Sequence, residues 1–146
     1  MMSAAKKLLA AAAVLGAVVA LALPVNASAS SPVRVDVAGT IRWASPTSWI
    51  VLDDAGHAPV GLAYVDVLPD RLRVHYTFTA DKINVVHVTP DEAFSAAGVR
   101  CGVSVGLSYA DVFCYMAGSS TPVDPALLTK AGGNLWISGT FELGEV

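Results

Sequence analysis

The stretch that most constrains the fold runs from residue 70 to 89, where apolar and polar side chains alternate. The alternating apolar residues of its first half are Leu72, Val74, Tyr76 and Phe78. A period of two is typical of a strand with one buried and one solvated face. Asp81 and Lys82 interrupt the alternation, and a run rich in β-branched residues resumes from Ile83 to Val88. The pattern predicts a β-hairpin at the centre of a mainly antiparallel domain.

Two further amphipathic strands are predicted at opposite ends of the remaining chain, at 33–43 and 135–143. Each carries a glycine on its apolar face, Gly39 in the first and Gly139 in the second. A glycine at such a position is typical of a bend or of the close approach of another layer. We expect these two strands to pair and so to close a barrel or cover the edge of a sandwich.

Short strands are predicted at 49–52 and 99–105, and the chain is expected to be extended over 58–68. The segment 108–118 is ambiguous, because Ser108 and Asp111 resemble a helical capping box while the following apolar residues favour a strand. We favour the strand. Trp43 and Trp49 fall in line with apolar positions, and we expect both in the core.

Two short helices are predicted near 90–97 and 125–131. The first would have Thr89 as its N-cap and Pro90 in its first turn, and the second would follow Pro125. The predicted fold class is therefore mainly β with minor α. We expect a small antiparallel barrel or a two-layer β-sandwich with two short peripheral helices.

The first 29 residues have the three parts of a signal peptide. Lys6 and Lys7 precede an apolar run from Leu8 to Leu23, and Ala27-Ser28-Ala29 follows as an A-x-A cleavage site. An uncleaved anchor is the alternative, although a membrane span needs about 20 apolar residues. We expect cleavage before Ser30, secretion, and a single domain over residues 30–146. The richness in alanine, valine and glycine suggests a bacterial source.

The expected mature chain is acidic. Loss of the two N-terminal lysines leaves seven basic against twelve acidic residues, a net charge of −5, while all 11 aromatic residues are retained. Nucleic acids and anionic lipids are bound chiefly by Lys and Arg contacts to phosphate. We therefore expect no nucleic-acid partner and no membrane association after cleavage.

The chain has two cysteines, Cys101 and Cys114. An even number of cysteines in an exported chain predicts a disulfide, and the C-x-x-C spacing of a metal site is missing. If the two are bonded across a hairpin, its turn centres on Leu107 and Ser108.

The three histidines are His57, His75 and His87. With a two-residue connection at Asp81-Lys82 in the predicted hairpin, His75 and His87 project from opposite faces. With a three-residue connection they become a cross-strand pair and a potential metal or acid–base site. We expect the first register, no metal site and no cofactor.

Other catalytic signals are weak. The aspartates at 53, 54, 66 and 70 could supply a carboxylate pair or a Ca²⁺ site, but they lack EF-hand spacing and are typical of turns. The stretch from Gly102 to Gly106 has the letters of a G-x-S-x-G elbow around Ser104. It lacks the following long helix and the later histidine that such a site needs.

The candidate binding residues are Trp136, Ser138 and Thr140, on the polar face of the last strand. An indole on such a face offers a flat apolar surface with one N–H donor, suited to a sugar ring or a protein contact; the alternative is that a helix covers it. We expect a secreted non-enzymatic binding module whose partner is a protein or a cell-envelope glycan. The alternatives are a small hydrolase with an Asp/His site and a secreted inhibitor of a partner protein.

Overall fold

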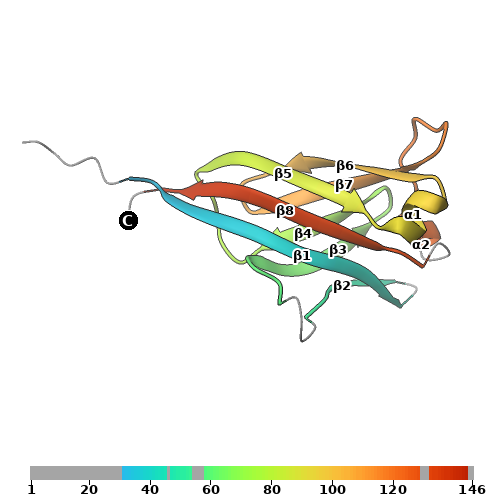
Figure 1. Ribbon diagram of the computed structural model, residues 1–146, viewed down its shortest axis with the longest axis horizontal. Coiled ribbons are helices and arrows are strands. Elements are labelled where there is room, and N and C mark those ends of the chain that lie inside the picture. Colours follow the sequence, from blue (N-terminus) through green and yellow to red (C-terminus); the bar gives the residue numbers. More distant parts are fainter. Residues whose placement is uncertain (1–30, 46, 54–57, 129–131, 145–146) are drawn as a thin grey trace, which may run out of the picture.

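The computed structural model describes residues 31–45, 47–53, 58–128 and 132–144. Two four-stranded antiparallel sheets pack face to face as a sandwich rather than a closed barrel (Figure 1). The first sheet has the order β2 (Ser48–Val51), β1 (Val33–Ser45), β8 (Asn134–Leu143) and β5 (Lys82–Pro90). The second has the order β3 (Leu62–Leu68), β4 (Arg71–Tyr76), β7 (Tyr109–Met116) and β6 (Val99–Val105).

The predicted pairing of the two terminal strands is confirmed. β1 and β8 run antiparallel in continuous register from Val33 opposite Leu143 to Arg42 opposite Asn134. A Cβ atom on Gly39 would lie 2.8 Å from Leu62 Cδ1, and one on Gly139 would lie 2.8 Å from the Val85 carbonyl oxygen. Both glycines therefore permit the close approach that their positions on an apolar face predicted.

The predicted central hairpin is wrong, because its two strands lie in different sheets. β4 pairs with β3 and β7, whereas β5 pairs with β8. The chain crosses between the sheets after Tyr76, and two hydrogen bonds fix the crossing: Ala80 N–H donates to Leu107 O, and Asp81 N–H donates to Glu142 O. Each strand buries one face between the sheets in either arrangement, so the alternation alone could not identify its partner.

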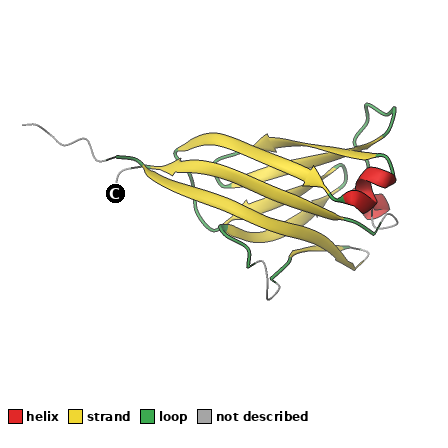
Figure 2. Ribbon diagram, viewed as in Figure 1, coloured by secondary structure: helices red, strands yellow, loops and turns green. Residues whose placement is uncertain are grey.

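Both predicted helices are present, and they lie at one end of the sandwich (Figure 2). Helix α1 (Glu92–Ala96) begins later than predicted, because Thr89 and Pro90 belong to β5 and Asp91 is the N-cap. The Asp91 carboxylate accepts from Phe94 N–H at 3.0 Å and from Asn134 N–H at 2.7 Å, and so joins the helix to the start of β8. Helix α2 spans Pro125–Leu128, and the rest of its predicted range lies outside the described residues.

The disulfide and the strand at 109–116 are confirmed. Cys101 and Cys114 are cross-strand partners in the β6–β7 hairpin, with Cα atoms 4.0 Å apart and a bond between their sulfurs. The turn is at Leu107-Ser108, where Gly106 N–H donates to Tyr109 O at 2.8 Å. The bond indicates folding in an oxidising compartment.

The core lies between the sheets and consists mainly of the inner faces of their strands, with Phe94 of α1 and Leu128 of α2 added at one end. Trp49 is 3% exposed and Trp43 packs against the same cluster, as predicted. The buried residues with the largest side chains include Phe94, Phe141, Ile41, Leu72, Leu135 and Ile137. Within the described ranges, no helix is long and apolar enough to cross a membrane.

Candidate functional site

Trp136 lies on the outer face of β8, where its side chain is open to solvent. Its neighbours Leu135 and Ile137 are completely buried, whereas Trp136 is 39% exposed. The alternative that a helix covers the indole is therefore not what the structure shows. The cross-strand partners of Trp136 are Thr40 on β1 and Thr89 on β5, both short side chains.

Ser138 and Thr140 continue the same outer face along β8. Ser138 lies between Ala38 and His87, and Thr140 lies between Asp36 and Val85. Successive outward residues of a strand are about 7 Å apart, so the three predicted residues form a row along the sheet. We call the area of Trp136, Ser138, Thr140, Thr40 and Thr89 the Trp136 face.

A charged cluster marks the far end of this sheet face. The Glu142 carboxylate accepts from Asn84 Nδ2 and from Lys82 Nζ, each at 3.2 Å. These hydrogen bonds, from Asn84 first and then Lys82, lower the pKa of Glu142 below its usual value. The carboxylate charge of Glu142 is thus neutralised by groups of the protein itself. Glu142 lies six residues from Trp136 along β8.

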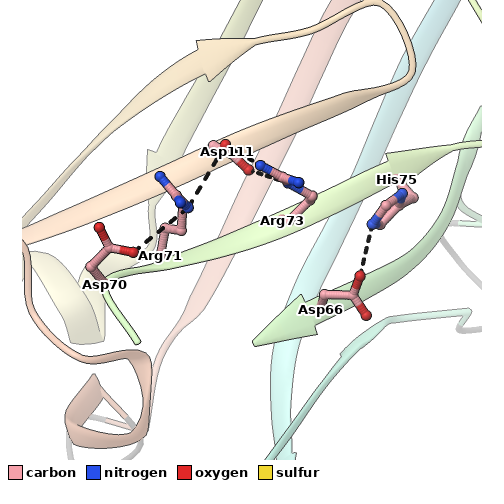
Figure 3. Close-up of polar contacts among 6 residues, drawn as sticks. All are labelled: Asp66, Asp70, Arg71, Arg73, His75 and Asp111. Atoms are coloured by element: carbon pink, nitrogen blue, oxygen red, sulfur yellow. Dashed lines mark hydrogen bonds and ion pairs between the residues drawn. The ribbon is translucent and has the colours of Figure 1, made fainter. Parts of the chain in front are cut away.

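The outer face of the other sheet carries a network that sequence reasoning missed. Arg73 donates to both oxygens of Asp111, from Nε at 2.7 Å and from Nη2 at 2.9 Å, and Arg71 Nε lies 3.8 Å from the same carboxylate (Figure 3). Asp111 is only 7% exposed. The hydrogen bonds from Arg73 hold the pKa of Asp111 below its usual value against the opposing effect of burial.

Aromatic rings support these arginines. The Arg73 guanidinium lies 4.1 Å from the centre of the Tyr109 ring, and that of Arg71 lies 5.5 Å from the centre of the Phe113 ring. Such cation–π contacts hold a guanidinium flat on the sheet. We call Arg71, Arg73, Tyr109, Asp111 and Phe113 the arginine ladder. The sequence showed arginines on the wet face of β4, but their acceptor and their rings come from β7, 36 to 42 residues later.

The alternative function, a small hydrolase with an Asp/His site, needs aspartate and histidine side chains in contact. The structure brings one such pair together. His75 Nε2 lies 2.9 Å from Asp66 Oδ2, and the His75 ring stacks on Tyr64 with ring centres 4.2 Å apart. Figure 3 shows this pair beside Arg73 and Asp111 on the same sheet. A cavity of about 260 Å³ lies elsewhere, against residues Arg42, Trp43, Leu128, Gly132 and Gly133.

The other candidates are dispersed. His75 lies on the outer face of β4 and His87 on the outer face of β5, so they occupy opposite sides of the sandwich; the hairpin register from which we argued their separation does not exist. Asp54 and His57 lie outside the described residues, Asp53 is exposed after β2, and Asp70 lies in the β3–β4 turn. Among the described residues, no three His, Cys, Asp or Glu side chains are grouped as a metal site.

The G-x-S-x-G letters fall on strand β6 and the turn after it. Ser104 faces outward on β6, and the chain continues through a tight turn into β7. A nucleophile elbow instead joins a strand to a helix.

Comparison with known proteins identifies no relative: no protein-family model matches the chain, and searches of curated proteins and of solved structures find no match.

Proposed function

We propose that this protein is an exported, non-enzymatic binding module and that the Trp136 face is its binding surface. The observation that carries the proposal is the exposed indole of Trp136 on a flat strand face, between the short side chains of Thr40 and Thr89. A large aromatic side chain is seldom left open to water on a strand, since its burial in a contact is favourable.

A glycan of the cell envelope is the ligand class that this surface fits best. The indole ring offers an apolar platform for the face of a sugar ring, and its N–H is a single donor. Thr40 and Thr89 flank it, and Ser138 and Thr140 follow it along β8; the hydroxyl groups of all four can both donate and accept. Two exposed charged residues of β1 lie on the same face, Arg42 opposite Asn134 and Asp36 opposite Thr140, while Glu142 farther along is already paired.

Binding is favoured over catalysis because of where the titratable groups lie. The Asp66–His75 pair is on the opposite side of the sandwich from Trp136 and is stacked under Tyr64 on an open sheet face. Arg73 and Asp111 are engaged with each other. The fold itself carries no argument for either role.

The test is co-sedimentation of the purified protein with insoluble peptidoglycan, together with tryptophan fluorescence. Trp136→Ala should abolish co-sedimentation and leave the melting temperature nearly unchanged, since the side chain is on the surface. Trp49 is buried and Trp43 packs half-buried against the core, so a fluorescence change on binding should come mainly from Trp136 and should disappear in the variant.

Tyr64→Ala is the matched control, because Tyr64 is an exposed aromatic residue (53%) on the other sheet. It should bind as the wild type does. Unchanged sedimentation of Trp136→Ala, or a fall of several degrees in its melting temperature with no loss of binding, would contradict the proposal.

A further inference from the structure

Arg42 borders the Trp136 face at one end, and its charge has no partner in the described part of the chain. β1 and β8 pair in continuous register, so Arg42, opposite Asn134, projects to the same side of the sheet as Thr40, opposite Trp136. The Arg42 side chain is exposed, and among the described residues no ion pair or side-chain hydrogen bond engages it. A free guanidinium therefore lies on the same surface as the exposed indole.

The register also fixes how far apart these two groups lie. Arg42 is two residues from Thr40, the partner of Trp136, and is therefore the diagonal neighbour of Trp136. Diagonal neighbours of an antiparallel pair are about 7–8 Å apart, within reach of long side chains. The guanidinium does not stack on the indole, because the cation–π contacts of the described residues are those of Arg71 and Arg73. The ring and the cation thus offer two separate contacts to one ligand.

The carboxylates around Arg42 do not neutralise its charge. Asp36 is on the same face but six residues away along β1, roughly 20 Å in an extended strand. Asp91 touches Asn134, but its oxygens accept from Phe94 N–H at 3.0 Å and from Asn134 N–H at 2.7 Å. Exposed charges are screened beyond about 10 Å at 0.1 M salt. An anion is therefore attracted to Arg42 locally, although the chain as a whole is acidic.

The surface at Arg42 is hollowed. Arg42 lines the cavity of about 260 Å³, whose other described residues are Trp43, Leu128, Gly132 and Gly133. A Cβ on Gly132 would meet no atom within 4 Å. A group bound by Arg42 therefore has room beside the end of the strand.

We propose that the ligand of the Trp136 face is an acidic sugar, whose ring lies on Trp136 while a carboxylate attached to that ring binds Arg42. This inference rests on the proposed function, since it names the class of glycan for the same surface. Charge complementarity selects the carboxylate: a guanidinium presents its N–H groups as a fork that matches two carboxylate oxygens. A neutral sugar makes the contact with the indole alone, so Arg42 is the residue that discriminates between the two.

The test compares two sugars with the same ring. N-acetylmuramic acid carries a carboxylate on a lactyl ether, and N-acetylglucosamine lacks it. In titrations of the purified protein at neutral pH, followed by the NMR signals of the Trp136 indole and the Arg42 guanidinium, the acidic sugar should bind at least about threefold more tightly, as expected of an exposed ion pair. Added salt should reduce this preference. Lactate alone, a carboxylate without the ring, should shift neither signal.

The outcomes separate this inference from the proposed function. Equal affinity for the two sugars would overturn the role of Arg42 and leave the Trp136 face as a binding surface for neutral glycans. Failure of both sugars to bind would overturn both. A response to lactate as strong as that to N-acetylmuramic acid would show an anion site without sugar recognition, and would also overturn the inference.

Arg42→Gln should abolish the preference for the acidic sugar and leave the affinity for N-acetylglucosamine unchanged, because only the charge is lost. Arg34→Gln is the matched control: Arg34 is an exposed arginine on the same face of β1, but opposite Glu142 at its other end. It should retain the preference. Trp136→Ala should abolish binding of both sugars. A preference that survives Arg42→Gln, or that falls equally in Arg34→Gln, would overturn the proposal.

Discussion

At the scale of single residues, Asp111 is the most consequential polar side chain of the described structure. It is nearly buried on a sheet face that no helix covers in Figure 1, and both of its oxygens accept from Arg73. A charged group in this position is stabilising only while its partner remains, because removal of one member leaves the other without its hydrogen bonds.

Asp111→Asn should therefore lower the free energy of unfolding at pH 7 by about 1.5–3 kcal/mol, the usual contribution of hydrogen bonds to a charged group. The pKa of Asp111 is lower in the folded than in the unfolded chain, so this stabilisation is present above the unfolded value, near 3.8, and is lost as pH falls through the folded one. The difference between wild type and variant should thus shrink below about pH 4.

Urea unfolding at pH 7 and at pH 3 checks this expectation. Asp70→Asn is the control, because Asp70 is half exposed and lies 3.6 Å from Arg71 Nε. It should change stability by less than about 0.5 kcal/mol. An Asp111→Asn variant as stable as the wild type at pH 7 would show that the arginine ladder contributes nothing to folding.

At the scale of elements, the β6–β7 hairpin is held by the disulfide and by the β4–β5 crossing. Tyr76 N–H donates to Ser108 O and Ala80 N–H donates to Leu107 O, so the turn of the hairpin is bonded to the chain that changes sheets. The hairpin thereby connects the two layers at one end, while the disulfide fixes its strands nearer the other.

Replacement of both Cys101 and Cys114 by alanine should lower the free energy of unfolding by about 3 kcal/mol, because the bond closes a short loop in the unfolded chain. Chemical denaturation of the oxidised protein and of the double variant measures the difference. Mass spectrometry without reductant provides the check, since two free thiols in the native protein would contradict the bond itself.

At the scale of the whole molecule, the first strand begins at Val33 and the last ends at Leu143, and the acidic domain they form follows the predicted signal peptide. We expect the exported protein to begin at Ser30 or within two residues of it, because the A-x-A site ends at Ala29. N-terminal sequencing of exported material tests this, and a sequence beginning at Met1 or Met2 would contradict it.

The sequence by itself determined the strands, the two helices and the disulfide, because these depend on local signals. Alternation marks a strand whose one face is buried, and capping residues mark a short helix wherever the chain places it. The pairing of β1 with β8 was also predictable, since both have a glycine on the apolar face and lie at opposite ends of the domain. The outward position of Trp136 followed from the same alternation.

Only the tertiary structure decided which strands are neighbours across the sandwich. The segments around Tyr76 and Val86 bury their apolar sides equally well as a hairpin or in two facing sheets, because burial of apolar surface has no direction. The arginine ladder depends on that choice, because Arg73 and Asp111 are 38 residues apart. It arises where residues distant in sequence become cross-strand neighbours, whereas the Asp66–His75 pair lies within the single hairpin of β3 and β4.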